Sequence, residues 1–232
     1  MTSSDELNPS SQINFGVDLY MRKIIVAFVR LLGYDIQKLP KRVEKQSIRD
    51  ENRQKKFKGK RVYVGCGDDH KDGYIGCDLR DTLTTSIQCK AWELSDHCEN
   101  LEEIYSRHML EHLTIKEVEC CLVDWRKSLK SGGRAVIIIP NMDFHIMQWG
   151  KARWNKESLS NENSNAAWGM AGFWGWQREC DPTLQNYNQS HWDVHKSGFN
   201  EESITYFLNA AGFRQIETKI VDECHLHAIA VK

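Results

Sequence analysis

From Arg61 to the C-terminus, short apolar runs alternate with longer runs whose apolar positions recur every three to four residues. Short apolar runs are typical of buried strands, and the longer period is typical of helices. The predicted strands are Val62–Val64, Tyr74–Asp78, Ser86–Cys89, Glu103–Tyr105, Ala135–Ile139, Gln215–Val221 and His225–Val231. The predicted helices run from Leu110 through Leu129, closed by Ser131–Gly133, and over Glu201–Ala211. This alternation predicts an α/β fold with a mostly parallel seven-stranded sheet and a C-terminal antiparallel hairpin.

Two neighbouring predicted strands end in residues suited to ligand binding. The first is followed by Gly65-Cys66-Gly67, where glycines allow the backbone to approach a ligand closely. The second ends on Asp78, whose carboxylate can accept hydrogen bonds from ribose hydroxyls. Only six residues separate Gly67 from Tyr74, so we expect a shortened first crossover without a full helix. The pattern indicates a nucleoside-bearing cofactor, S-adenosylmethionine, and hence methyl transfer.

The stretch 141–200 interrupts the alternation directly after the fifth predicted strand. It holds most of the tryptophans in the chain, namely Trp149, Trp154, Trp168, Trp174, Trp176 and Trp192. A long insertion at this place lies on the ligand side of such a sheet, so we expect a substrate lid. A small aromatic core that serves only packing is the alternative left open.

Residues 1–57 form a predicted extension to an α/β domain over residues 58–232. Within the extension, residues 17–32 have a wide apolar face, which predicts an amphipathic helix ending near Gly33. Such a helix can pack on its own domain or on the partner subunit of a homodimer. The alternative is peripheral membrane contact through residues 17–61, because a cluster of basic side chains from Lys38 to Arg61 follows the helix.

Charge is unevenly distributed. Residues 1–61 hold 14 Lys/Arg against 7 Asp/Glu, about +7, and the remainder holds 17 against 25, about −8. An acidic catalytic domain argues against a nucleic-acid partner, whose phosphates need a positive surface. The first residues do not resemble a secretory leader, and we interpret the eight cysteines as reduced thiols. We therefore expect a cytoplasmic protein, peripheral on the inner membrane surface if its helix binds lipid.

Several motifs in order resemble one family. They are Val64–Gly67, Gly73–Leu79, Ile104–Leu113, Trp125–Gly133, Ile139–Asn141 and His195–Phe199. Residues 60–232 resemble the type 11 class I S-adenosylmethionine-dependent methyltransferases, and especially small bacterial enzymes linked to surface-polysaccharide biosynthesis. The resemblance implies a Rossmann-like methyltransferase domain. It also implies a small-molecule acceptor, for which a saccharide or lipid-linked glycan is our hypothesis.

The resemblance also implies roles for individual residues. Gly65, Cys66 and Gly67 would hold the methionine end of the cofactor, and Asp78 and Leu79 would contact its ribose and adenine. An acidic residue that the family often places after the third strand is replaced here by Lys90. The adenine contacts are then expected from the Ala91 backbone and a stacked Trp92.

Residues expected near the reacting methyl group follow the fourth and fifth strands. By resemblance, Arg107 and His108 would lie beside the sulfonium sulfur of the cofactor. His108 is the first candidate for a general base, because the pKa of histidine lies near neutral pH. Asp143 and His195 are further catalytic candidates. A purely structural role stays open for both histidines.

Other functions fit parts of the same sequence. His108, Glu111 and His112 match the H-x-x-E-H pattern of zinc hydrolases, which requires them on one helix face. A nicotinamide enzyme would need a third glycine where His70 stands. A metal site built from His191, His195 and Cys180 lacks paired ligand motifs, so we predict no metal. A cofactor-binding partner protein without catalytic activity remains an alternative, because Lys90 replaces the expected acid.

Overall fold

The computed structural model of the protein describes residues 56–178, 180, 182–183, 187 and 193–232. The predicted helix over residues 17–32 and most of the basic cluster fall outside these ranges, as do His191 and Trp192. Within them, no helix has the length and apolar character needed to cross a membrane.

A seven-stranded sheet forms the centre of the domain, in the order β4-β3-β2-β6-β7-β9-β8. Its strands are β2 (Arg61–Val64), β3 (Tyr74–Asp78), β4 (Thr85–Gln88), β6 (Leu101–Arg107), β7 (Leu129–Pro140), β8 (Arg214–Val221) and β9 (His225–Val231). All neighbours are parallel except that β9 runs antiparallel to both β7 and β8. This topology confirms the predicted fold, a Rossmann-like methyltransferase sheet with a C-terminal antiparallel hairpin.

The connection between β2 and β3 confirms the shortened first crossover. Residues 65–73 contain turns and no helix. The amides of Gly65 and Cys66 both donate to the Cys77 carbonyl oxygen, at 2.8 and 3.2 Å. These bonds fold the turn back onto β3, so the ends of the two strands lie side by side.

The helix after β6 differs from the prediction in its first part. Leu110–His112 form a separate 3-10 turn, η2, and α4 begins only at Ile115 and ends at Ser128. Thr114 interrupts the helix because it forms a capping box with Glu117: the Glu117 amide donates to the threonine hydroxyl, and the Thr114 amide donates to the Glu117 carboxylate. The sequence interpretation of one helix from Leu110 to Leu129 is therefore wrong.

The segment Ser131–Gly133 also differs, because it lies inside β7 rather than in a helix-closing loop. Leu129 pairs with Leu101 of β6, and the Lys232 amide donates to the Gly133 carbonyl oxygen at 2.9 Å. The segment is an irregular part of the strand, because the register with β6 shifts between Leu129 and Arg134 and Gly132 has a φ of +73°, in the left-handed region that favours glycine.

Two short helices and a second small sheet complete the sheet domain. They are α3 (Leu94–His97), α8 (Glu201–Ala210), and the parallel pair β1 (Phe57–Lys58) and β5 (Cys98–Glu99). The predicted domain boundary between residues 57 and 58 falls inside β1. The core between helices and sheet is closely packed around Trp125, Leu101, Ile104, Leu122 and Ile137, all fully buried.

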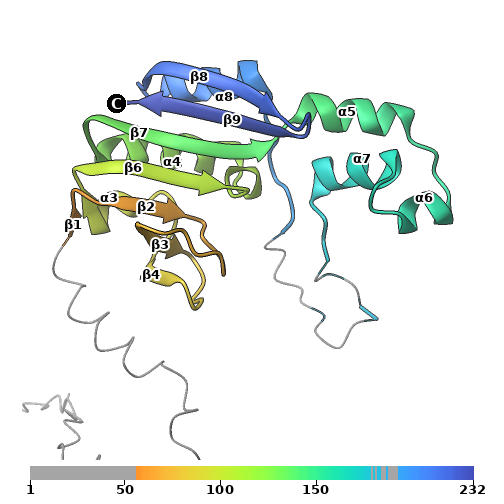
Figure 1. Ribbon diagram of the computed structural model, residues 1–232, viewed down its shortest axis with the longest axis horizontal. Helices are drawn as coiled ribbons and strands as arrows, with labels where there is room; N and C mark the ends of the chain where they lie inside the picture. The colour runs from red at the N-terminus through yellow and green to blue at the C-terminus, as the bar shows by residue number, and fades with distance from the viewer. Residues whose placement is uncertain (1–55, 179, 181, 184–186, 188–192) are drawn as a thin grey trace, which may run out of the picture. The chain divides into compact units, whose positions relative to one another are not determined.

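The insertion after β7 is helical. Its elements are α5 (Met142–Lys151), α6 (Lys156–Ser160) and α7 (Asn165–Trp174). Helices α5 and α7 pack closely, because Gly169 and Gly172 of α7 leave room for Trp149 and His145 of α5. Figure 1 shows this group beyond the carboxyl ends of β6 and β7, where the arrows point. The insertion therefore lies on the side of the sheet where α/β proteins bind ligands.

Candidate functional site

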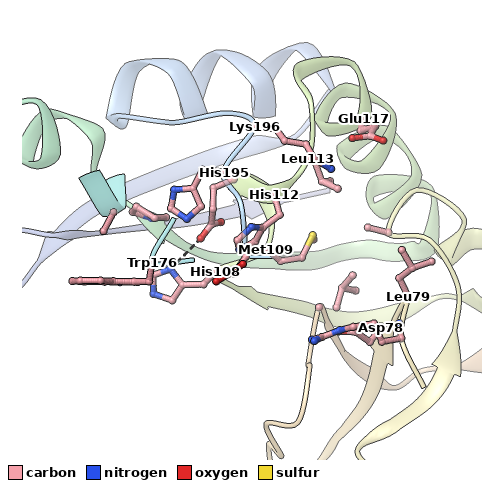
Figure 2. Close-up of a pocket in the computed structure, with 18 of the residues that line it drawn as sticks. Asp78, Leu79, His108, Met109, His112, Leu113, Glu117, Trp176, His195 and Lys196 are labelled. Atoms are coloured by element: carbon pink, nitrogen blue, oxygen red, sulfur yellow. Dashed lines mark hydrogen bonds and ion pairs between the residues drawn. The ribbon is translucent and has the colours of Figure 1, made fainter. Parts of the chain in front are cut away.

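A cavity of about 730 Å³ opens at the carboxyl ends of β2, β3, β6 and β7. This is within the usual size range of small-molecule sites. Figure 2 shows Asp78 and Leu79 on one side, His108, His112, His195 and Trp176 on the other, and Met109 between them. The predicted residues that line the cavity are Gly65, Asp78, Leu79, Ala91, Trp92, His108 and His195.

The turn after β2 passes close to the cavity because Gly65 has no side chain. Its φ of +73° lies in the left-handed region that favours glycine. A Cβ at this position would lie 2.3 Å from Cγ of Met109, so a larger residue would force Met109 to move. The glycine thus keeps the backbone of the turn exposed at one wall of the cavity.

Asp78 at the end of β3 is nearly buried and organises the same wall. Its Oδ2 accepts a hydrogen bond from the Gly67 amide at 2.8 Å, and its Oδ1 accepts one from the Arg80 amide at 2.8 Å. The Arg80 guanidinium adds an ion pair at 3.3 Å. Oδ1 therefore accepts two bonds from Arg80, whereas Oδ2 has a second lone pair and can still accept a hydrogen bond from a ligand hydroxyl. Arg80 also lines the cavity, and sequence reasoning missed it.

The segment after β4 contributes a flat apolar wall. Ala91 and Trp92 both line the cavity. The Ala91 carbonyl oxygen accepts a hydrogen bond from the Trp125 indole at 2.9 Å, which anchors the segment to the buried face of α4. Lys90, which stands in place of the expected acid, forms an ion pair with Glu93 at 2.9 Å. The positive charge at Lys90 is therefore balanced locally.

His108 directly follows β6 and lies in a strained conformation beside a buried carboxylate. Its φ is +49°, which is unusual for a residue with a side chain. Nδ1 of His108 lies 3.1 Å from Oε1 of Glu111, which is fully buried. Burial acts to raise the pKa of Glu111, but the hydrogen bond from His108 and the nearby His112 outweigh it and lower the pKa. Because an ionised carboxylate only accepts, Nδ1 carries the proton in the neutral form of His108, and the free lone pair is then on Nε2.

The chain returning from the insertion closes onto η2. The amides of Lys196 and Ser197 donate to the Glu111 carbonyl oxygen at 2.8 and 3.1 Å. As a result, His195 and His112 lie with their ring centroids 5.1 Å apart. Burial lowers the pKa of His195, so this imidazole is neutral at pH 7.

Four predicted site residues do not line the cavity. Cys66 is buried beneath the turn, where burial raises the pKa of its thiol. Gly67 uses its amide to bind Asp78. Arg107 is exposed, because the strand alternation of β6 buries Ser106 and turns the next side chain outward. Asp143 lies in the first turn of α5, where its Oδ1 accepts a hydrogen bond from Asn200 at 3.2 Å.

The insertion supplies to the cavity wall His145, which the sequence analysis did not single out, and two tryptophans of the predicted lid. His145 of α5 is buried and lines the cavity together with Trp168 and Trp176. Trp149, Trp154 and Trp174 instead pack against one another away from it, with ring centroids 4.5 and 5.3 Å from Trp149. The tryptophan-rich stretch therefore contributes both to the cavity and to a separate aromatic cluster. Its lid function stays a prediction.

The zinc-hydrolase pattern is not formed as the sequence interpretation required. His108 lies at the end of a strand, and only Leu110–His112 form a helical turn. His108 and His112 are therefore not one helical turn apart on a common face. Instead, Glu111 and His112 come together with His195.

No family model matches the chain, and no curated protein sequence matches it. Solved structures with a similar fold include an S-adenosylmethionine-dependent methyltransferase from Archaeoglobus fulgidus, with 16% identity and a TM-score of 0.46, covering 93% of this chain and 100% of that chain. A second, from Methanosarcina mazei, has 14% identity and a TM-score of 0.48, and the match covers 79% of this chain and 96% of that chain. A TehB-like methyltransferase from Corynebacterium glutamicum has 13% identity and a TM-score of 0.42, and the match covers 91% of this chain and 96% of that chain. Likeness this remote says nothing about activity or acceptor.

Proposed function

We propose that this protein is an S-adenosylmethionine-dependent methyltransferase that acts on an oxygen or nitrogen of a small molecule. The proposal rests on one observation, the position of Gly65 next to Asp78 at the cavity wall. They line the same wall of one cavity, at the carboxyl ends of two adjacent parallel strands. An exposed backbone turn beside a nearly buried carboxylate is suited to a ligand that carries a ribose.

The residues present fit this cofactor. Gly65 keeps the backbone of the turn at the cavity wall with Met109 packed where a Cβ would lie, and Asp78 would accept hydrogen bonds from the ribose hydroxyls. Trp92 would stack on the adenine, as expected from its place after β4. The Asp78 carboxylate would then bind both the Arg80 guanidinium and the ribose.

In such a reaction the acceptor atom forms a bond to the methyl carbon as the carbon–sulfur bond breaks, and the electron pair stays on the sulfur. The protein has to position the acceptor and remove its proton where needed. His108 is the proposed base, because Glu111 holds its Nδ1–H and leaves Nε2 as the acceptor of the proton. His195 is a second candidate for the base at the same end of the cavity, provided that its Nε2 binds no metal ion.

The first experiment is calorimetric titration of the purified chain with S-adenosylmethionine and S-adenosylhomocysteine. We expect micromolar binding that Asp78→Asn weakens about 10- to 100-fold, the effect of losing a hydrogen bond to a charged group. Asp72→Asn is the matched control, because Asp72 is exposed on the loop between β2 and β3. No binding by the wild-type chain would refute the proposal. Binding without methyl transfer to any acceptor would instead favour the non-catalytic partner protein.

For the acceptor we propose a saccharide. Trp168 and Trp176 line the end of the cavity near His108, and indole faces stack on sugar rings. Transfer of labelled methyl groups to nucleotide-linked and lipid-linked sugars tests this idea. Labelling only of amines or phenols would exclude it.

Peripheral membrane contact through residues 17–61 and a homodimer are further proposals, both drawn from the apolar and basic pattern of the sequence. If the acceptor is lipid-linked, membrane contact would hold the protein close to it at the cytoplasmic face. Co-sedimentation of the full chain with anionic vesicles, compared with a chain lacking residues 1–55, tests the first proposal. Equal sedimentation of both chains would refute it.

A further inference from the structure

Three possible metal ligands converge at the histidine end of the cavity. Glu111, His112 and His195 each offer one ligand atom, and these atoms lie within 4.8 Å of one another. Glu111 and His112 belong to η2, whereas His195 lies on the chain that returns from the insertion. The three residues are brought together by the backbone bonds between residues 196–197 and Glu111.

Both histidines are held in the tautomer that binds metals through Nε2. Nδ1 of His112 lies 3.2 Å from the Val194 carbonyl oxygen, and Nδ1 of His195 lies 2.9 Å from that of Gly172. A carbonyl oxygen only accepts, so Nδ1 carries the proton in each ring and the Nε2 lone pair is available. Metal-binding histidines are commonly oriented by a hydrogen bond of this kind.

The carboxylate of Glu111 gives an independent indication of a missing partner. Glu111 is 1% exposed, and its Oε1 is engaged by His108. Its Oε2 is buried and has no hydrogen-bond partner in the described part of the chain. A buried charged oxygen without a partner is unfavourable, and a cation at this position would satisfy it.

The spacing and the ligand types suit zinc. Zinc binds histidine nitrogen and carboxylate oxygen at about 2.0–2.2 Å, which places tetrahedral ligand atoms about 3.4 Å apart. Small side-chain rotations can bring three atoms that lie within 4.8 Å of one another to this distance. Two histidines and one glutamate leave a fourth position open, as in catalytic zinc sites.

We propose that Glu111, His112 and His195 bind one divalent transition-metal ion of the zinc class, a site that the sequence analysis did not predict. All three residues line the cavity, so the open position is accessible to a small molecule. If the proposed methyl transfer holds, the metal would bind an oxygen of the acceptor and lower its pKa. That last step rests on the proposed function, whereas metal binding itself does not.

The test uses the full chain after removal of metal with EDTA. Co²⁺ is titrated and followed by its visible absorption, and Zn²⁺ is then added to displace it. We expect one Co²⁺ per chain, and at least about 100-fold weaker binding in Glu111→Gln and in His195→Asn. His70→Asn is the control, because His70 is exposed and does not line the cavity. Circular dichroism of each variant shows whether it is folded.

Absence of stoichiometric binding by the wild-type chain would overturn the proposal, and so would unchanged affinity in both folded variants. X-ray absorption of the zinc-loaded wild-type chain tests the site without any variant. Two histidine nitrogens in the first shell are expected, and sulfur ligands would place the metal elsewhere. Asp78→Asn separates the two proposals, since it should lose S-adenosylmethionine affinity and keep Co²⁺ affinity.

Discussion

Replacing Gly65 by alanine tests the claim that this turn is packed against Met109. The residue has a φ of +73°, and a left-handed conformation costs a residue with a Cβ about 1–2 kcal/mol. The new Cβ would also lie 2.3 Å from Cγ and 2.6 Å from Cβ of Met109. Overpacking of this kind adds about 1–3 kcal/mol. Gly65→Ala should therefore lower the free energy of unfolding by about 2–5 kcal/mol.

Gly73→Ala is the matched control for the backbone contribution. Gly73 has a φ of +79°, and no atom of the described residues lies within 4 Å of the position of its Cβ. Both variants reduce the entropy of the unfolded chain equally, so this effect cancels in the comparison. The difference between the two variants, about 1–3 kcal/mol, then isolates the contact with Met109.

Urea unfolding followed by circular dichroism measures both variants, and calorimetry measures their affinity for S-adenosylmethionine. Gly65→Ala should weaken binding, because the displaced Met109 lines the cavity, and Gly73→Ala should leave it unchanged. Equal destabilisation by the two substitutions would refute the packing argument. Unchanged cofactor affinity in a folded Gly65→Ala variant would refute the role of the turn in the site.

Two further predictions concern packing and pH. Trp125→Phe removes the indole that donates to the Ala91 carbonyl oxygen. This substitution should lower the free energy of unfolding by about 2–4 kcal/mol and weaken cofactor binding. A loss below about 1 kcal/mol in urea unfolding would contradict this expectation. Burial lowers the pKa of His145 in the folded protein. As the pH falls, His145 is therefore protonated in the unfolded chain before it is protonated in the folded one, and the free energy of unfolding decreases below about pH 6.5. Urea unfolding in EDTA at pH 7.5 and 5.5 should show a smaller loss in His145→Asn than in wild-type, and an equal loss would refute this role of His145.

Many elements were predicted because their signals are local. Tyr74–Asp78 has the predicted bounds in the structure, and the terminal hairpin was misplaced by a single residue at the start of β8. The errors occurred where local signals competed. Thr114 forms a helix cap within an otherwise helical pattern, and the glycines of Ser131–Gly133 resemble a turn although they form part of a strand. In the second case the glycines form an irregularity inside the strand, where the register with β6 shifts and Gly132 has a positive φ.

The apolar alternation, the glycine turn and the terminal acid of β3 were enough to predict the sheet and to place Gly65 and Asp78 at one edge of it, since strand ends meet wherever parallel strands pair. Only the tertiary structure brought His195 to Glu111 and His112. That meeting depends on how a helical insertion folds back, through the bonds from Lys196 and Ser197 to the Glu111 carbonyl oxygen. Periodicity reports which face of an element is buried, and it carries no information on which distant side chain that face will meet.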